Sequence, residues 1–372
     1  MASNSELRDE AVALLQQAID VLAGITDAPA PAELKGIYHG AYIDGTTMAG
    51  YYGPDYAYTV PEDPDERVQK RYESDAGKSI ALSHWGLGSA STPIWDSDAD
   101  EMVSKFEEAN RRGCYPLLDT STASVFLGDI AKGKYDDKIR AWFETIAAYG
   151  RPLLLRLNTE MNGAWYGYGA NDAQGPNQPQ NFVASWKHIH EIADSVGCAN
   201  ISWHWAPNSL PPWEPDYFPW PYDAYYPGDE YVDWTGFVCY QQSKDASEGD
   251  WFYLSGPSYD AALACAPGKP MAISEWSSFF EFTGPPTNPD RGVASSKGER
   301  LRGALEYVRD SQPAIRAMVM FNTGYETGKG EHNEIETSQD AMDGFYAGIS
   351  DPVYLGRQAV LATDQKVPIP SR

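Results

Sequence analysis

Two glutamates stand at the ends of short apolar runs, and a pair of carboxyl groups is what most enzymes that hydrolyse a glycosidic bond use. Glu160 follows the apolar run that begins at Pro152, and it precedes a loop made largely of glycine and aromatic residues. Glu275 stands in the run MAISEWSS, which begins at Met271. If one carboxyl gives and takes a proton while a second carboxyl, about 5 to 5.5 Å from the first, attacks the anomeric carbon, configuration is retained.

Short apolar runs that favour strands recur along the chain, and segments with helical periodicity separate most of them. Eight runs are predicted as strands, and they begin at Gly36, Ser79, Cys114, Pro152, Ile201, Val232, Met271 and Ile315. Helices are predicted over 98–113, 134–150 and 297–310. Alternation of strand and helix implies parallel pairing through right-handed crossovers. Eight such units in roughly 300 residues predict an α/β fold, a (β/α)8 TIM barrel, over residues 36–372.

A doubly wound open sheet is the alternative fold, because it also alternates strand and helix. Such a sheet normally carries a glycine-rich phosphate loop after its first strand, and residues 40–50 (GAYIDGTTMAG) lack the G-x-G-x-x-G spacing. The barrel is therefore favoured. Segments 44–66, 209–230 and 279–296 are then long loops after strands one, five and seven, where a binding cleft is normally built.

Residues at the C-terminal ends of barrel strands build the active site in enzymes of this fold. Glu160 would end the fourth strand and Glu275 the seventh, so the two carboxyl groups should face each other across the barrel mouth. An acid/base needs a raised pKa, which Trp165, Tyr166 and Leu155 could provide at Glu160 by limiting its hydration. The other glutamate must stay ionised. Tyr240, Arg156 and His204 are the candidate donors to it.

The stretch TEMNGAWYGYG, from Thr159, with Arg156 before it and ISWHWAPN after it, resembles glycoside hydrolase family 26. That family belongs to a clan of (β/α)8 retaining hydrolases, and its members include β-1,4-mannanases, β-1,3-xylanases and mixed-linkage β-glucanases. The resemblance extends from about Gly36 to Thr323 and is sharpest around Glu160. It implies a cofactor-independent endo-acting hydrolase of a β-mannan or related β-glycan.

By the same resemblance, Glu160 is the acid/base and Glu275 is the nucleophile. The family usually has a His immediately before its acid/base, where this chain has Thr159. That His belongs to the sugar-contacting side of the site, so the departure bears on mannan specificity and leaves the two-carboxylate chemistry in place.

Further side chains are predicted to contact the substrate by hydrogen bonding or by stacking on sugar rings, since the chain is rich in aromatic residues, with 24 Tyr and 12 Trp. They are Trp165, Tyr240, Arg156, Asn158, His204, Trp205, Trp276, Trp85, Asp119 and Asn208. Several of them have a structural alternative. Arg156 could pair with Glu160, Trp205 and Trp276 could fill the barrel, and Asn158 and Asp119 could cap helices.

The charge of the chain limits its partners. Lys and Arg total 28 against 53 Asp and Glu, a formal net charge of −25 that would repel nucleic acid and anionic membranes. No run reaches the roughly 18 apolar residues that span a bilayer. No signal peptide is visible at the N-terminus. The location is left open, with an extracellular or cell-surface one favoured over a cytoplasmic one.

No metal or cofactor is predicted. The four cysteines lack C-x-x-C spacing. His188 and His190 form the only close histidine pair, and on a helix residues at i and i+2 point apart.

Residues 5–24 predict an amphipathic helix, because apolar residues recur there at helical spacing behind an acidic first turn. With the Pro- and Ala-rich linker it forms a separate segment, 1–35. Two interpretations stay open, a helix that packs on the barrel and a tether to a partner. Two rival functions also stay open, a hydrolase of a bacterial cell-wall polysaccharide and a non-catalytic carbohydrate-binding barrel.

Overall fold

The computed structural model of the chain describes residues 34–45, 51–52, 64–86, 92–210, 218–241, 251–278, 296–324, 332–358, 361 and 366–372. A compact unit from Lys35 to Pro370, with Arg372, contains the strands and helices described below. The predicted helix over 5–24 lies outside the described residues, as do most of the predicted loops 44–66 and 279–296. The separate N-terminal segment, its tethering role and the extracellular location therefore stay predictions.

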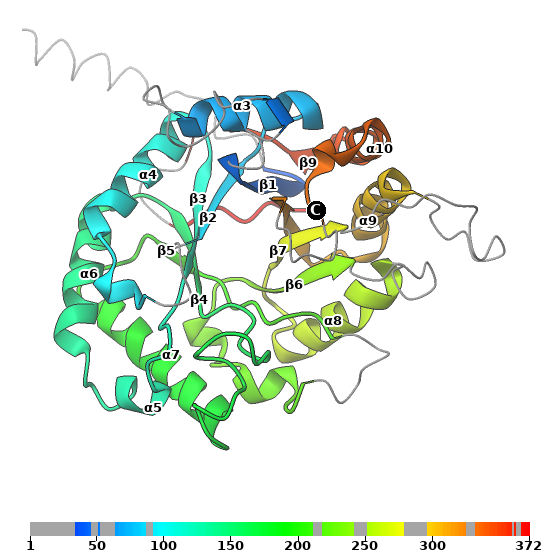
Figure 1. The fold of residues 1–372 in the computed structure, drawn as a ribbon. Coiled ribbons are helices and arrows are strands. Elements are labelled where there is room, and N and C mark those ends of the chain that lie inside the picture. Colours follow the sequence, from blue (N-terminus) through cyan, green and yellow to red (C-terminus); the bar gives the residue numbers. More distant parts are fainter. Residues whose placement is uncertain are drawn as a thin grey trace, which may run out of the picture. The chain divides into compact units, whose positions relative to one another are not determined.

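All eight predicted strands form, and they pair in parallel in one curved sheet (Figure 1). The strands are β1 (Ile37–Ile43), β2 (Leu82–Gly86), β3 (Tyr115–Thr120), β4 (Leu153–Leu157), β5 (Ile201–Trp203), β6 (Thr235–Gln241), β7 (Met271–Ser278) and β8 (Ile315–Asn322). Their order is β5-β4-β3-β2-β1-β8-β7-β6, and the short β9 (Tyr354–Leu355) pairs with β1. β1 pairs with β8 over six registered positions, so the first and last of the eight strands are neighbours.

The two ends of this sheet, β5 and β6, are joined by isolated parallel bridges. His204 bridges to Trp234, and Asn208 bridges to Val238. Backbone amides of Trp205 and Ser209 donate to the carbonyls of Trp234 and Val238 at 2.9 Å. The curled eight-stranded sheet is thus continued across the last gap, as the predicted (β/α)8 barrel requires.

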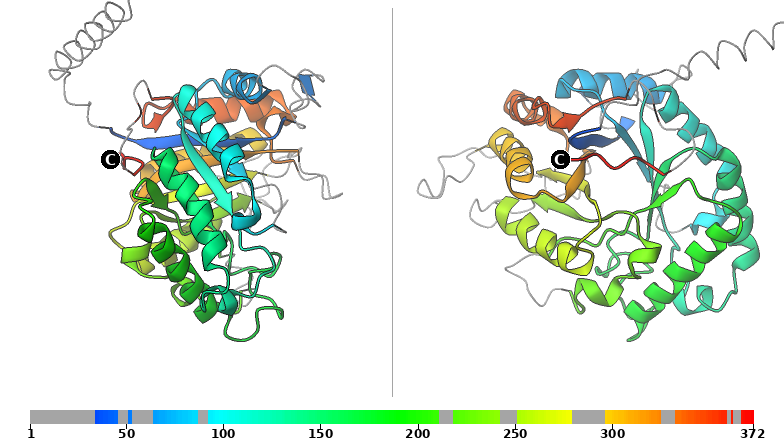
Figure 2. Two further views of the ribbon diagram at one scale, coloured as in Figure 1. Left: turned by 90° about the vertical axis from the view of Figure 1, so that its left-hand side faces the viewer. Right: turned by 180° about the vertical axis from the view of Figure 1, so that it is seen from behind.

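Helices follow the strands and lie outside the sheet in all three views (Figures 1 and 2). They are α3 (Pro64–Ala76), α4 (Ala99–Arg111), α5 (Leu127–Ile130), α6 (Asp136–Tyr149), α7 (Gln178–Ser195), α8 (Trp251–Cys265), α9 (Lys297–Ser311) and α10 (Gln339–Ile349). Short 3-10 turns cover Ile94–Asp96, Tyr222–Tyr225, Asp229–Tyr231 and Ile335–Thr337. The three helices predicted from periodicity correspond to α4, α6 and α9. In the described part of the chain, no helix is both long and apolar enough to cross a bilayer.

Helix α6 shows why these segments fold as they do. Ile139, Trp142, Phe143 and Ile146 recur at helical spacing, and all four are buried. Gly150 ends the helix at φ 67°, a left-handed conformation that costs glycine little. The apolar stripe therefore packs α6 onto the sheet, and the glycine turns the chain into β4.

Strand β4 explains the unbroken apolar run at Leu153. All five of its residues are buried, because a parallel strand in a barrel faces the interior on one side and the helices on the other. Leu153 and Leu155 belong to the apolar core. Arg156 is the one charged residue of β4, and its guanidinium lies inside the barrel with no exposed surface. Such a charge needs partners, and the site provides them.

Candidate active site

Glu160 lies just beyond β4 in a strained turn. The strand ends at Leu157, three residues earlier than the predicted end. Asn158 and Glu160 have φ of 50° and 55°, a left-handed region that is unfavourable for residues other than glycine. The backbone amide of Glu160 donates to the carbonyl of Ala206 at 2.8 Å, and this bond holds the turn against the chain after β5.

The carboxyl group of Glu160 is buried and accepts two hydrogen bonds. The amide of Asn208 donates to Oε1, and Nε1 of Trp165 donates to Oε2 at 3.2 Å. Burial, and next the negative charge of Glu275, raise the pKa of Glu160 to about 7. The predicted elevation is confirmed in direction. Its causes are burial and a second carboxylate, whereas Trp165 acts in the opposite sense by donating to the ionised form.

The Trp165 ring forms a platform beside Glu160. Its side chain is 46% exposed, which is unusual for a tryptophan. The ring lies over Gly163, where an added Cβ would fall 2.2 Å from ring carbon Cη2. Glycine at 163 therefore lets the indole fold back far enough for its N–H to reach the carboxyl group.

Glu275 lies within β7, as the fifth of its eight residues, and not at the strand end as predicted. The β6–β7 register shifts beside it, since Phe237 pairs with Ile273 and Val238 pairs with Glu275. Ser274 is therefore unpaired in this ladder. A bulge of this kind changes the direction of the following side chain. Here that side chain is Glu275, which lines a pocket at the barrel mouth.

Arg156 connects Glu275 to the rest of the site. Its Nη2 donates to Oε1 of Glu275 and to Asp119, its Nε donates to Asp119, and its Nη1 donates to Oγ of Ser274 at 2.8 Å. Tyr240 donates its hydroxyl hydrogen to Oε2 of Glu275. Two of the three predicted donors to Glu275 are therefore in place. Bonds of this type favour the ionised carboxylate.

Asp119 is the second carboxylate that pairs with Arg156. Burial pushes the pKa of the Asp119 carboxyl upward, but Arg156 and His84 outweigh burial and hold the pKa well below its usual range. Nε2 of His84 lies 2.9 Å from Oδ2 of Asp119. The site thus contains one carboxyl group with a raised pKa, Glu160, beside carboxylates that receive hydrogen bonds from a guanidinium.

One trio in the described part of the chain could offer ligands to a metal ion. Atoms of His84, Asp119 and Glu275 lie within 4.8 Å of one another. Arg156, however, donates to both carboxylates, and its charge occupies the position that a cation would need. These residues form an ion-pair network and fit a metal poorly.

A pocket of about 210 Å³ opens onto this network at the barrel mouth. It is lined by Tyr42, His84, Gly86, Asp119, Thr120, Ser121, Thr159, Tyr166, Tyr168, Glu275 and Phe321. Tyr42 and Phe321 are stacked, with ring centroids 4.9 Å apart. Thr159 donates its hydroxyl hydrogen to the carbonyl of Ala206 at 3.3 Å. Its side chain is therefore engaged with the backbone.

Three of the predicted stacking tryptophans do not reach the mouth. Trp205 is fully buried and donates its N–H to the carbonyl of Tyr225 at 3.1 Å. Trp276 is buried against Phe345, with centroids 5.9 Å apart. Trp85 is half-buried against the apolar core and lines no part of the mouth pocket. Each of the three predictions is wrong, because alternate strand residues point away from the barrel interior.

Two polar predictions are also wrong. His204 lies inside the barrel with Nδ1 3.2 Å from the carbonyl of Trp234, away from Glu275, and burial, with the charge of Arg156 next, lowers its pKa to about 3. The side-chain amide of Asn158 is hydrogen-bonded to Thr122. Its Oδ1 accepts from the backbone amide at 2.7 Å, and its Nδ2 donates to the hydroxyl at 3.0 Å. Burial keeps His204 from a sugar, and the hydrogen bonds to Thr122 engage the Asn158 amide.

Ser274, Tyr42 and Phe321 are parts of the site that the sequence reasoning missed. Ser274 contacts Arg156 from the bulge, whose position no local pattern reveals. Tyr42 and Phe321 occupy neighbouring registered positions on β1 and β8. The signal that could have identified both rings is their position at the C-terminal ends of the first and last strands, where site residues gather.

Arg156→Met is expected to destabilise the fold by about 3–5 kcal/mol, because it leaves Asp119 and Glu275 buried without their counter-charge. Denaturant unfolding measures this loss. Arg302→Met removes an exposed guanidinium 3.8 Å from Glu306 and should change stability by under about 0.5 kcal/mol. Equal losses in the two variants would contradict the assigned role of Arg156.

The pH dependence of stability gives a second readout. Asp119 has a native pKa below its unfolded value, so its ion pair stabilises the fold fully above the unfolded pKa of about 4. That contribution is lost as pH falls toward the native pKa. The native chain should lose stability more steeply below pH 4 than Arg156→Met, which has already lost the pair.

The curled sheet of eight parallel strands thus carries one carboxyl side chain on β7 and another just after β4, toward the ends of the strands where active sites of (β/α)8 enzymes are built. Residues 120–269 match the family model for glycosyl hydrolase family 26, a range that includes Glu160. The resemblance to glycoside hydrolase family 26 that the sequence predicts is therefore confirmed over this range.

Known proteins similar to this chain come from several sources. Endoglucanase H of Acetivibrio thermocellus is 22% identical over 295 residues, which cover 79% of this chain and 30% of that protein. Beta-1,3-xylanase TXYA of a Vibrio species is 26% identical over 288 residues, covering 74% and 58%. The chain thus spans less than two thirds of either relative. The solved structure of Bacillus subtilis mannanase man26 shares the fold, with a TM-score of 0.56, 18% identity and coverage of 91% and 92%.

Proposed function

We propose that this protein is a retaining endo-glycoside hydrolase that cleaves a β-1,4-mannan or a related β-glycan. The observation that carries the proposal is that two neighbouring carboxyl groups, those of Glu160 and Glu275, have different surroundings. Burial and its neighbour raise the pKa of Glu160 to about 7, which suits a proton donor. Glu275 receives hydrogen bonds from Arg156 and Tyr240, which suit a carboxylate that must stay ionised.

The reaction follows from these settings. Glu160 protonates the glycosidic oxygen while Oε of Glu275 attacks the anomeric carbon, so the C–O bond to the leaving sugar breaks as a glycosyl ester forms. Glu160, now ionised, removes a proton from water, which attacks the same carbon and releases Glu275. Each displacement inverts the carbon, so the product keeps the substrate's configuration.

The same geometry favours a sugar ring as substrate. Trp165 exposes an indole face next to Glu160, where a pyranose can stack while its linking oxygen meets the acid. Tyr42 and Phe321 add a stacked aromatic pair to the lining of the pocket that Glu275 also lines. Asp119 and His84 reach the same pocket and can bind hydroxyl groups.

The β-linked class of substrate is supported by the names of the relatives, an endoglucanase, a β-1,3-xylanase and a mannan endo-1,4-β-mannosidase of Bacillus subtilis. Thr159 is the residue that bears on the choice among them. Its hydroxyl donates to a backbone carbonyl, so it offers a sugar less hydrogen-bonding capacity than an imidazole would.

The test is release of reducing ends from β-1,4-mannan, β-1,3-xylan, mixed-linkage β-glucan and bacterial cell-wall polysaccharides. Proton NMR of the first product should show the β-anomer before mutarotation. An α-anomer formed first would exclude the double displacement. Calorimetric binding of an oligosaccharide without any product would instead support the rival carbohydrate-binding barrel.

Asn208→Ala is expected to move the basic limb of the activity profile to higher pH. Asn208 donates to Glu160 and lowers its pKa, so the acid of the variant stays protonated at higher pH. Loss of the orienting bond should also lower kcat/KM by about tenfold at pH 6. Initial rates between pH 4 and 9 measure both effects. Asn181→Ala, on α7 away from the pocket, is the control and should leave the profile unchanged.

A further inference from the structure

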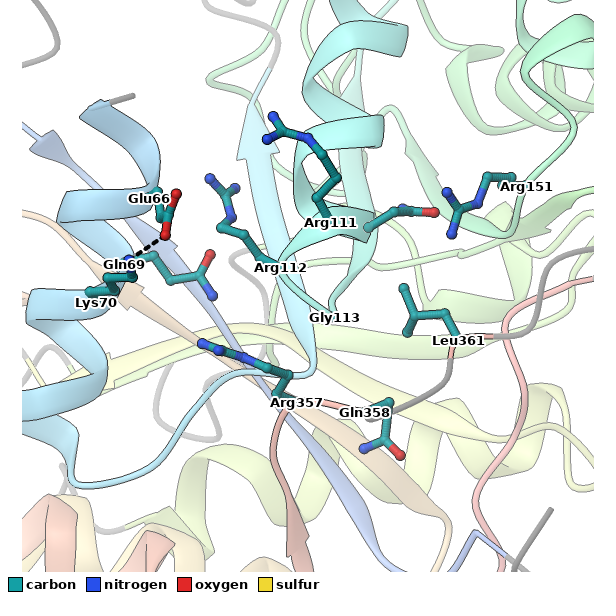
Figure 3. A pocket seen from close by; sticks show the side chains of 11 residues that line it. Glu66, Gln69, Lys70, Arg111, Arg112, Gly113, Arg151, Arg357, Gln358 and Leu361 are labelled. Atoms are coloured by element: carbon teal, nitrogen blue, oxygen red, sulfur yellow. Dashed lines mark ion pairs between the residues drawn. The ribbon is translucent and has the colours of Figure 1, made fainter. Parts of the chain in front are cut away.

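A second pocket, which we term the basic pocket, lies among α3, the end of α4 and the residues before β3 and β4 (Figure 3). Its volume is about 460 Å³, within the range of sites for small molecules. It is lined by Glu66, Gln69, Lys70, Asn110, Arg111, Arg112, Gly113, Arg151, Arg357, Gln358 and Leu361. Gly113 and Arg151 stand two residues before β3 and β4. The pocket therefore lies toward the N-terminal ends of these strands, whereas Asp119 and Glu160 lie at and just beyond their C-terminal ends.

The charge of the basic pocket is opposite to that of the chain, whose formal net charge is −25. Four arginines and one lysine line it, against the single carboxylate of Glu66. Three of the cations have acidic partners, as Lys70 pairs with Glu66, Arg112 pairs with Glu108, and Arg357 pairs with Glu73. Arg111 and Arg151 form no ion pair with any described residue. Two positive charges are therefore left for a ligand.

Buried polar atoms of the lining also lack partners within the described residues. Nε of Arg112 and Nε of Arg151 are buried donors without a hydrogen bond. Oε1 of Gln69 is a buried acceptor in the same condition, while Nε2 of Gln69 donates to Glu73 at 2.8 Å. Buried polar groups are normally satisfied. The lining thus contains polar atoms that the described residues leave unsatisfied, beside the guanidinium groups of Arg111 and Arg151.

The wall of the pocket is built by a close backbone contact. The amide of Gln358 donates to the carbonyl of Gly113 at 3.1 Å, and the amide of Arg357 donates to Oγ of Ser79 at 3.0 Å. Gly113 has φ 78°, and a Cβ added there would fall 2.6 Å from Cγ of Arg357 and 2.9 Å from the carbonyl oxygen of Gln358. Only glycine lets the C-terminal segment approach this closely, and this segment supplies Arg357.

We propose that the basic pocket binds the phosphate monoester of a small hydroxylated molecule, of monosaccharide size. A phosphate monoester carries about −1.5 to −2 charges at pH 7, which matches the two unpaired cations. Guanidinium groups bind phosphate oxygens through paired N–H donors. The volume exceeds what a bare phosphate fills, and the polar side chains of the lining, Gln69, Asn110 and Gln358, suit a hydroxylated carbon skeleton.

The experiment is isothermal titration calorimetry of the full chain at low ionic strength, with glucose 6-phosphate, inorganic phosphate, glucuronate and glucose as probes. Glucose 6-phosphate is expected to bind most tightly, inorganic phosphate more weakly, and the other two much more weakly. Arg111→Gln and Arg151→Gln should each weaken the binding of glucose 6-phosphate at least about tenfold. Arg140→Gln, which removes an exposed arginine that donates to Ser195, is the matched control.

Several results would overturn the proposal. One is that neither glucose 6-phosphate nor inorganic phosphate gives a heat of binding. Another is an equal loss of affinity in Arg140→Gln, which would mean attraction by overall charge. Glucuronate binding as tightly as glucose 6-phosphate would assign the pocket to carboxylates. The site is independent of the proposed hydrolase, so Arg111→Gln should keep full polysaccharide hydrolysis and the native melting temperature, since its side chain is exposed.

Discussion

Glu275→Ala is expected to lower kcat by at least about 10⁴-fold, because it removes the atom that attacks the anomeric carbon. The fold should survive the change, since Arg156 keeps Asp119 as a partner. Release of reducing ends from the best polysaccharide substrate measures the loss. Full activity in this variant would rule out Glu275 as the nucleophile.

Azide distinguishes a missing nucleophile from a damaged fold. The alanine leaves a space beside Arg156 and Tyr240, both of which stabilise an anion there. Azide can enter this space and attack the anomeric carbon of an activated β-glycoside, which gives an α-glycosyl azide after a single displacement. Glu306→Ala, an exposed position on α9, is the control and should show native rates without azide.

Glu160→Gln is expected to lower kcat by about 10² to 10⁴-fold on polysaccharide, because an amide cannot protonate the leaving oxygen. Aryl glycosides with acidic phenol leaving groups need little protonation, so their glycosylation step should be far less affected. The ratio of the two losses, measured from initial rates and burst kinetics, is the readout. Equal losses on both substrates would contradict the acid role.

The acid role of Glu160 also predicts how activity changes with pH. An acid must be protonated to act, so the native activity should fall as pH rises through about 7, the pKa that burial and Glu275 give Glu160. In Glu160→Gln this basic limb should vanish, because the titrating group is gone. A variant that kept the same basic limb would assign the titration to another group.

Much of the fold could be predicted from the sequence because its elements are set by local patterns. Eight apolar runs and the helical periodicity between them predict alternating units, and the structure confirms all eight strands. The strand numbers then place Glu160 and Glu275 at one mouth. What could not be predicted is the exact aim of each side chain. Glu275 depends on a bulge near Ser274, and a bulge arises from pairing between strands.

The tryptophans that were wrongly predicted to stack on sugar show that residue type alone does not reveal which ring reaches the barrel mouth. Trp165 and Trp205 both follow strands and both stand near glutamate or histidine in the sequence. Trp165 sits in a glycine-rich turn that leads its ring out to the mouth, whereas Trp205 continues the strand direction into packing with Tyr225. The direction of the backbone over two or three residues decides which ring reaches solvent. That direction cannot be inferred from the composition of the sequence.

The pairing of β1 with β8 has a consequence for synthesis of the chain. Tyr38 meets Ala317, so β1 waits for a partner about 280 residues further along. At about 5–20 residues per second, a ribosome needs roughly 15 to 60 s to deliver that partner. Throughout this time one side of β1 is an unpaired apolar edge, of the kind that promotes aggregation. Assistance from holding chaperones during translation, and slow final closure typical of non-local topology, follow from where the two strands lie in the chain.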